Sequence, residues 1–162
     1  MKKVLITGGA GFIGYHLAGY LANKRGYEIN LIDNLSRGKL DQDLRRLINK
    51  YHIEFIRKDL THQAACNDLD KNYDYIYHFA GIVGVRNVIS NPDKVLYTNI
   101  VSLLNLLEWI RKTQKNLKKL LFSSTSEVYA GTLKYYKAAV PTDENINLCL
   151  DDSSSPRTAY AL

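Results

Sequence analysis

A run of glycines near the N-terminus constrains this chain more than any other feature. An apolar segment, Val4–Thr7, comes first, and three glycines spaced three residues apart follow it: Gly8, Gly11 and Gly14. Glycines at this spacing permit a tight turn off a strand, let a phosphate approach the main chain, and let the next helix pack close to the sheet. The first turn of that helix offers free N–H groups and partial positive charge to an anion. The pattern therefore predicts a phosphate-binding turn between a strand and a helix.

Asp33 extends this pattern, because it ends a second apolar segment 19 residues after Gly14. This arrangement is typical of a dinucleotide-binding unit in which an acidic side chain accepts hydrogen bonds from the ribose hydroxyls. A 2′-phosphate would meet a like charge there, so we expect NAD rather than NADP, although Arg37 stands close enough in sequence to pair with such a phosphate. The alternative is that Asp33 is only a turn residue.

Strand and helix patterns alternate along the chain as far as Ser123. Strands are predicted at Val4–Thr7, Glu28–Ile32, Ile53–Arg57, Tyr75–Phe79 and Lys119–Ser123, and helices at Phe12–Asn23, Leu40–Asn49, Thr61–Leu69 and from Pro92 to about Thr113. This alternation predicts an α/β fold with a doubly wound parallel sheet (Rossmann fold), strand order 3-2-1-4-5 and three α/β/α layers. A ligand is then expected at the carboxyl ends of the first and fourth strands, where the order reverses.

Two of these helices have apolar faces that we expect to pack on the sheet. The faces consist of Phe12, Ile13, Leu17, Tyr20 and Leu21 in the first helix, and of Val95, Leu96, Ile100, Leu103, Leu104, Leu107 and Ile110 in the last. Thr61 is expected to cap the short third helix. The segment Tyr129–Ser155 is predicted to be a long loop, which in such domains is often functional.

Length and composition limit the classes of protein to consider. A chain of 162 residues predicts one domain, and no run approaches the roughly 18 apolar residues of a membrane span. Cys66 and Cys149 have no motif spacing with each other or with the histidines, so we expect reduced thiols in a cytoplasmic protein and no metal site. The net charge of +6 is dispersed, which predicts no nucleic-acid module but would attract an anionic nucleotide.

Several segments, in order, resemble motifs of the extended short-chain dehydrogenase/reductase family, which includes the NAD-dependent nucleotide-sugar epimerases and dehydratases. The segments are 7–14 (TGGAGFIG), 33–36 (DNLS), 59–60 (DL), 78–81 (HFAG), 123–129 (SSTSEVY) and 155–162 (SPRTAYAL). The resemblance covers essentially the whole chain. It implies NAD as the cofactor, a nucleotide-sugar as the substrate, and a homodimer as the assembly of the parent enzyme.

The resemblance also assigns roles to individual residues. The implied cofactor contacts are Gly8, Gly11, Phe12, Ile13, Asp33, Asn34, Asp59, Leu60, Phe79, Ala80, Gly81, Asn99 and Ser123. Catalysis is implied at Thr125, Glu127 and Tyr160, where the tyrosine removes the proton of a sugar hydroxyl, usually at C4, while hydride leaves for the nicotinamide. A tyrosine with its ordinary pKa of ~10 is a poor base at neutral pH. The family lowers this pKa with a lysine four residues later.

The sequence ends at Leu162, before the position of that lysine and before the small C-terminal domain that holds the nucleotide-sugar in the family. We therefore expect residues 1–162 to be the N-terminal, NAD-binding portion of such an enzyme and to be catalytically silent alone. Two alternatives stay open, a non-catalytic dinucleotide-binding module and a simple reductase that uses free NAD(P)H.

The residues around Glu127 bear on the subclass. The pair Ser126-Glu127 resembles the UDP-glucuronate decarboxylases, whereas dehydratases of the family carry Asp-Glu and epimerases carry small or neutral residues. Ala130 stands where the family usually has glycine, and the loop from Tyr129 to Tyr160 is longer than is typical. Taken alone, Glu127 could equally be an ordinary loop carboxylate, and Tyr160 a surface aromatic. Epimerisation, dehydration and decarboxylation all remain open.

Overall fold

The computed structural model describes residues 1–156 and 158–161, and the chain divides into two compact units. Unit 1 comprises Met1–Gly81 and Asn99–Ser123, and unit 2 comprises Ile82–Thr98 and Ser124–Leu162. The long helix α4, Pro92–Thr113, contributes residues to both units.

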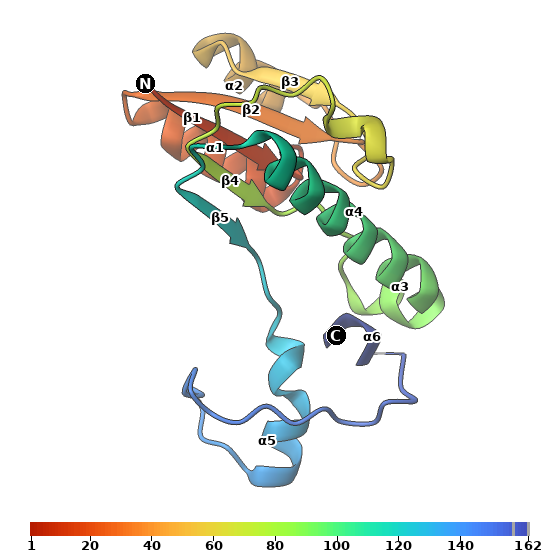
Figure 1. Ribbon diagram of the computed structural model, residues 1–162. Coiled ribbons are helices and arrows are strands. Elements are labelled where there is room, and N and C mark those ends of the chain that lie inside the picture. The colour runs from red at the N-terminus through yellow and green to blue at the C-terminus, as the bar shows by residue number, and fades with distance from the viewer. Residues whose placement is uncertain (157, 162) are drawn as a thin grey trace. The chain divides into compact units, whose positions relative to one another are not determined.

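Unit 1 is built on a five-stranded parallel sheet (Figure 1). Its strands are β1 (Lys2–Thr7), β2 (Tyr27–Asp33), β3 (Glu54–Arg57), β4 (Tyr75–His78) and β5 (Lys119–Phe122). The order is β3-β2-β1-β4-β5, which confirms the predicted topology. At its carboxyl end β1 pairs Thr7 with Ile32 on one side and with His78 on the other. The reversal of strand order, and with it the crevice expected for a ligand, therefore lies between β1 and β4.

Helices cover both faces of this sheet and make the three predicted layers. On one face, α1 (Phe12–Asn23) and α2 (Gln42–Tyr51) pack on alternate residues of β1, Val4 and Ile6. On the other face, Leu5 packs with Leu106 and Trp109 of α4. Both faces of β1 are apolar because a parallel strand in such a fold is buried on both sides.

The structure corrects the predicted face of α1. The buried residues are Gly14, Ala18 and Leu21, whereas Phe12 is 81% exposed and Ile13 is 58% exposed. Small side chains make the contact because the helix start lies very close to the turn before it: a Cβ on Gly14 would lie 2.3 Å from the Gly8 carbonyl oxygen. Phe12, Ile13 and Tyr20 are therefore exposed, whereas Leu21 is buried and Leu17 packs against the core, as predicted.

The predicted face of α4 is also wrong in part. Val95 is buried as expected, but Ile100, Leu104 and Leu107 are exposed, while Leu106 and Trp109 enter the core. The helix has apolar residues on more than one face, so the sequence pattern alone did not identify the face that packs on the sheet.

The predicted helix at Thr61–Leu69 is only a short 3-10 turn, η1, over Gln63–Cys66. Thr61 does not cap it, since the residue at the cap position is His62. Instead the main-chain N–H and the hydroxyl of Thr61 both donate to Oδ1 of Asp59, at 2.9 and 2.7 Å. Aspartate commonly binds the amide two residues later, and here that local turn replaces the cap.

Unit 2 contains α3 (Val85–Ser90), the beginning of α4, the 3-10 turn η2 (Ser126–Tyr129), α5 (Ala130–Tyr136) and the short helix α6 (Thr158–Ala161). The prediction of an unbroken loop over Tyr129–Ser155 is therefore wrong at its beginning. Helix α5 forms there because a later segment packs on it: a Cβ on Gly131 would lie 2.2 Å from the carbonyl oxygen of Cys149.

Thr132 fastens that later segment to α5. It is 1% exposed, its hydroxyl donates to the carbonyl of Asn147 at 3.1 Å, and the same oxygen accepts from the Cys149 N–H at 2.8 Å. Asp151 is held in addition by Lys134 and by the hydroxyl of Tyr135, each at 2.8 Å. The segment between Thr132 and Asn147 is thus closed at its base.

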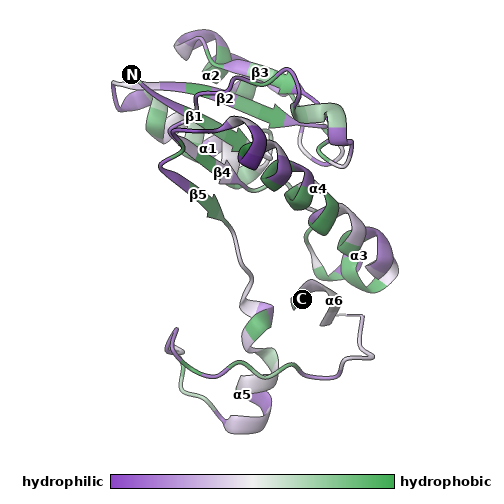
Figure 2. Cartoon of the chain, viewed as in Figure 1, coloured by the Kyte–Doolittle hydropathy of each residue, from purple (hydrophilic) through white to green (hydrophobic). Residues whose placement is uncertain are grey.

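The hydrophobic residues of unit 1 are not all buried. Figure 2 colours most of β5 as hydrophobic, whereas β4 is mostly pale. In β4, Ile76 is fully buried, whereas in β5 Leu121 is 41% exposed and Phe122 is 55% exposed. The strand β5 lies at the edge of the described sheet.

Candidate functional site

The glycine turn after β1 has the geometry that its spacing predicts. Gly8 has a φ of +70°, and a Cβ there would lie 2.7 Å from the carbonyl carbon of Phe79 at the end of β4. A side chain at Gly14 is excluded by the closeness of the Gly8 carbonyl described above. Both glycines are therefore required by the packing of the protein itself.

Gly11 differs from these two, because the nearest atom that a Cβ would meet is the Gly8 carbonyl oxygen at 3.2 Å. Its φ of −80° and ψ of 167° suit any residue. Gly11 precedes α1, and in the described structure no side chain caps that helix. The space beside Gly11 and the uncapped first-turn amides of Phe12 and Ile13 fit a pyrophosphate, which needs close approach to main-chain N–H groups.

Asp33 is held in place before any ligand arrives. Its Oδ2 accepts from the N–H of Ala10 at 3.0 Å, and its Oδ1 accepts from the N–H of Leu35 at 2.8 Å. The loop that follows lies against the glycine turn, since a Cβ on Gly38 would lie 2.7 Å from that of Ala10. Asp33 is thus a turn residue that stands beside the glycine turn at the carboxyl end of β2, and its role as a ribose ligand stays a prediction.

Asn34 and Asp59 are brought together by the same end of the sheet. The amide of Asn34 donates to Oδ2 of Asp59 at 3.0 Å. Partial burial alone would raise the pKa of Asp59, but hydrogen bonds from Thr61 and Asn34 outweigh it and hold this pKa below its usual value. The carboxylate is consequently charged and fixed at neutral pH.

Leu60 is the one implied cofactor contact whose side chain is in the core, at 5% exposure. A contact with a cofactor would have to come from its main chain. Sequence reasoning missed Asn105 of α4, whose side-chain amide donates to the carbonyls of Leu60 and Thr61 at 2.9 and 3.1 Å. Nothing in the local sequence around Asn105 indicates this contact with a loop 44 residues earlier.

The end of β4 is fixed by a buried polar group. The hydroxyl of Thr7 lies 2.8 Å from Nδ1 of His78, and the same oxygen accepts from the N–H of Ala80 at 3.1 Å. Burial lowers the pKa of His78 to about 4. Beyond Ala80, a Cβ on Gly81 would lie 3.1 Å from Oδ1 of Asn99, so these two implied cofactor residues are neighbours. Ser123, also implied, follows β5 and is exposed.

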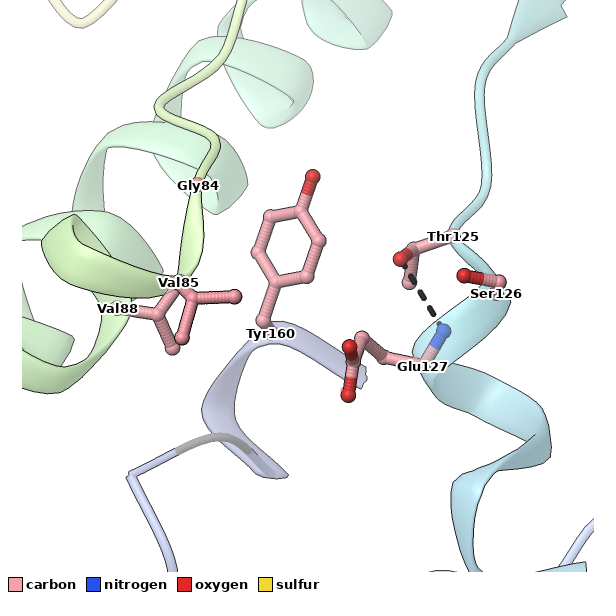
Figure 3. Close-up of a pocket in the computed structure, with 7 residues that line it drawn as sticks. All are labelled: Gly84, Val85, Val88, Thr125, Ser126, Glu127 and Tyr160. Carbon is pink, nitrogen blue, oxygen red and sulfur yellow. Dashed lines mark hydrogen bonds between the residues drawn. The ribbon is translucent and has the colours of Figure 1, made fainter. Parts of the chain in front are cut away.

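The implied catalytic residues meet in unit 2, around a cavity of about 140 Å³. Thr125, Ser126 and Glu127 come from η2 and the residue before it, and Tyr160 comes from α6. Figure 3 shows the ring of Tyr160 between the segment of Val85 and Val88 on one side and Thr125 on the other. Residues far apart in sequence thus form one pocket with hydroxyl, phenol and carboxylate groups.

A hydrogen bond to the main chain orients Thr125 in this pocket. Its side-chain oxygen accepts from the N–H of Glu127 at 3.3 Å and thereby caps η2 (Figure 3). The hydroxyl proton of Thr125 can then be directed to another acceptor. The pocket therefore offers a donor at Thr125, a candidate base at Tyr160 and a second acid–base group at Glu127.

Sequence reasoning missed the apolar wall of this pocket. Gly84, Val85 and Val88 line it, and Gly84 begins α3 with a φ of +105°. The signal was weak: a glycine followed by two valines three residues apart, which is one turn of a helix. A six-residue helix is too short for periodicity to reveal.

Among residues 1–156 and 158–161, His, Cys, Asp and Glu side chains form no group of three that could hold a metal ion. Within the same ranges, every helix is too short or too polar to cross a bilayer.

Comparison with known proteins places this geometry in a family. The sequence model of the NAD dependent epimerase/dehydratase family matches residues 4–162. The chain is 33% identical over 167 aligned positions to a UDP-N-acetyl-alpha-D-glucosaminuronate decarboxylase of Bacillus cytotoxicus, covering 99% of this chain and 46% of that protein. It is 36% identical to a CDP-paratose 2-epimerase of Salmonella typhi, covering 83% of this chain and 40% of that protein.

Solved structures agree. The UDP-Glc/GlcNAc 4-epimerase of Campylobacter jejuni aligns with a TM-score of 0.81 at 30% identity, over 99% of this chain and 46% of that one. A UDP-glucose 4-epimerase of Bifidobacterium longum, crystallised with NAD+ and UDP, aligns with a TM-score of 0.79 at 28% identity, over 98% of this chain and 46% of that one. The chain thus spans about half the length of the relatives it matches. With its glycine turn, its switch-point crevice and its family match in agreement, the chain belongs to the NAD dependent epimerase/dehydratase family, and its cofactor is NAD.

Proposed function

We propose that this chain carries the NAD-binding portion of an enzyme that oxidises a hydroxyl of a nucleotide-sugar, at C4 of the sugar. The observation that carries the proposal is the pocket of unit 2, which gathers Thr125, Glu127 and Tyr160 around one cavity. NAD, when bound, supplies the hydride acceptor.

The proposed roles follow from the chemistry of each side chain. Tyr160, as a phenolate, takes the proton of the sugar hydroxyl, and Thr125 hydrogen-bonds the same oxygen and orients it. Glu127 lies in the same pocket and serves as acid or base at the neighbouring carbon. The valines of α3 give the pocket an apolar wall, which excludes water from one side of the sugar ring.

Relatives of three kinds support a nucleotide-sugar substrate without fixing the reaction. The matches include a decarboxylase, 4-epimerases and an NDP-hexosamine 5,6-dehydratase. The Ser126-Glu127 pair favours decarboxylation, so a UDP-linked uronic acid is the first substrate to assay.

The test is turnover of UDP-, dTDP-, GDP- and CDP-sugars with NAD, with products identified by mass and by sugar stereochemistry. Since the resemblance calls for a lysine four residues after Tyr160, the assay compares the 162-residue chain, which we expect to be silent, with one that includes that position. Tyr160→Phe is expected to abolish turnover while leaving NAD affinity unchanged. Tyr136→Phe, at a tyrosine that is 71% exposed and outside the pocket, is the matched control. Full activity of Tyr160→Phe would refute the assignment.

One observation favours a second candidate, a dinucleotide-binding module without catalysis. Every residue assigned to the cofactor lies in unit 1, which has its own apolar core on both faces of the sheet. Binding of NAD without turnover of any nucleotide-sugar, in either chain, would select this candidate.

The assembly and location belong to the proposal as well. A homodimer is supported by an exposed apolar stripe of α4, which consists of Ile100, Leu104 and Leu107. Light scattering of the wild-type protein and of Leu104→Lys tests it, because a charge in a buried interface would shift the mass to that of a monomer. The proposed location is the cytoplasm, which is compatible with the free thiols of Cys66 and Cys149.

A further inference from the structure

A buried side-chain hydrogen bond joins the carboxyl ends of β1 and β4. Thr7 is fully buried and His78 is 1% exposed, and the two side chains, 71 residues apart in sequence, lie at hydrogen-bond distance. The Thr7 oxygen also receives the N–H of Ala80. This group lies where the strand order reverses, at the crevice in which a fold of this kind binds its dinucleotide.

The Thr7 oxygen has one proton and two lone pairs, so it can donate to Nδ1 of His78 or accept from it, and the two arrangements differ in which imidazole nitrogen carries the proton. The N–H of Ala80 donates to the Thr7 oxygen, so the single hydroxyl proton of Thr7 is free to be donated to Nδ1 of His78. Nδ1 can accept only if it carries no proton, so in this arrangement the imidazole proton is on Nε2. The lowered pKa of His78 agrees with a neutral ring at physiological pH.

Packing alone does not explain an imidazole at this place. Across the part of the chain that the structure describes, Nε2 of His78 has no hydrogen-bond partner. The ring otherwise stacks on Phe122 at the end of β5, with centroids 5.7 Å apart. A leucine would fill such a space without leaving a buried polar atom unpaired. The property that distinguishes His78 from an apolar residue here is the acceptor at Nδ1.

We infer that Thr7 and His78 are positioning residues for NAD, which together fix the main chain of Ala80 and Gly81 against the Gly8 turn. Ala80 N–H is held by Thr7, and the Gly8 turn is in backbone contact with Phe79 and Ala80. A small change in the distance between the end of β1 and the end of β4 would move the main chain on both sides of the crevice. The inference rests on the NAD-binding part of the proposed function and is independent of the catalytic part.

Two matched pairs of variants test the inference. Thr7→Val removes the hydroxyl and keeps the shape, while Thr7→Ser restores the hydroxyl. His78→Leu removes the acceptor, while His78→Asn places an oxygen where Nδ1 stands. We expect His78→Leu to weaken NAD binding about five- to tenfold, since it loses one buried hydrogen bond, and Thr7→Val to weaken it at least as much, since it also removes the acceptor of the Ala80 N–H. The serine and asparagine variants are expected to stay within about twofold of wild type.

The double variant Thr7→Val/His78→Leu adds a test of coupling. It is expected to bind NAD about as weakly as Thr7→Val alone, because Thr7→Val already removes the hydrogen bond that His78→Leu breaks. Affinities are measured by calorimetry at a temperature where circular dichroism shows every variant to be folded. Unchanged NAD affinity in Thr7→Val and His78→Leu, with only the unfolding midpoint altered, would reduce the pair to a structural role and overturn the inference.

A spectroscopic measurement tests the hydrogen bond without NAD. The imidazole nitrogens of His78 in ¹⁵N-labelled wild-type protein are expected to resonate as an unprotonated Nδ1 and a protonated Nε2. A proton on Nδ1 would overturn the inference and leave the proposed function standing. Failure of the wild-type protein to bind NAD at all would instead overturn the proposed function, and the inference with it.

Discussion

Gly11→Val is expected to weaken NAD binding strongly while changing the stability of the fold only slightly. Valine suits the extended backbone of Gly11, and its Cβ would meet only the Gly8 carbonyl oxygen at 3.2 Å, which must yield by a few tenths of an ångström. Valine is a poorer residue than glycine before a helix, whereas the loss of a glycine restricts the unfolded chain and favours folding. These effects oppose each other, so the free energy of unfolding should change by at most about 1 kcal/mol.

Binding of NAD responds much more strongly. The valine side chain occupies the space through which a pyrophosphate reaches the amides at the start of α1. Hydrogen bonds to a charged group contribute about 1.5–3 kcal/mol each, so loss of two of them costs about 3–6 kcal/mol, or roughly 10²- to 10⁴-fold in affinity. Calorimetric titration with NAD measures this loss, and thermal unfolding followed by circular dichroism measures the stability.

Gly14→Ala is the matched control, and it should show the opposite pattern. Its Cβ would lie 2.3 Å from the Gly8 carbonyl oxygen, a contact that only a shift of the main chain can relieve. Overpacking of this kind costs about 1–3 kcal/mol of stability. If Gly11→Val binds NAD with the affinity of wild type, the space beside Gly11 is not the pyrophosphate site and the reasoning fails.

Further predictions concern three side chains of unit 1. Asp33→Ala is expected to weaken NAD binding by about 1–3 kcal/mol and to reduce the preference for NAD over NADP; calorimetry showing tighter NADP binding by the wild type would contradict this. Asn105→Leu leaves the carbonyls of Leu60 and Thr61 without their donor and should lower the free energy of unfolding by about 1–3 kcal/mol in urea titrations, so an unchanged midpoint would count against that contact. His78 has a folded-state pKa of about 4, below its ordinary 6.5, so the unfolded chain binds its proton first as the pH falls between these values. Stability should therefore decrease across this window by roughly 3 kcal/mol, and His78→Asn, tested by urea unfolding at each pH, should lack this component.

The sequence predicted the strands and the first helix because the residue patterns that indicate them are local. The apolar run Val4–Ile6 indicates a strand buried on both faces. The predicted bounds of the first helix, Phe12–Asn23, are the bounds of α1 in the structure. The packing face of α1 was predicted only in part: Leu21 is buried, but Phe12 and Ile13 are exposed, and closeness to the Gly8 turn requires glycine at position 14. Helix α5 was missed because contacts with residues near Cys149 stabilise it, and these contacts are distant in sequence.

In the candidate site, too, the sequence predicted local motifs but not contacts between distant parts of the chain. The spacing of Gly8, Gly11 and Asp33 predicted a cofactor site at this end of the sheet because a phosphate turn is a short, local motif. The contribution of Asn105 could not be found in this way, since it depends on which loop lies beside α4 in the folded chain. The roles of Thr125, Glu127 and Tyr160 rest on the resemblance, and their meeting around one cavity supports them without testing them.

The closed base of the segment after Thr132 makes it a promising place for protein engineering. Both ends are tied to one buried hydroxyl, while residues between them, such as Tyr136 and Val140, are 71% and 82% exposed. The entropy of closing a loop grows only slowly with its length, so an insertion there adds little cost as long as the base stays intact. A fluorescent tag or an affinity peptide placed near Val140 should therefore be tolerated, which would provide a handle for immobilising the protein without altering its nucleotide-binding turn.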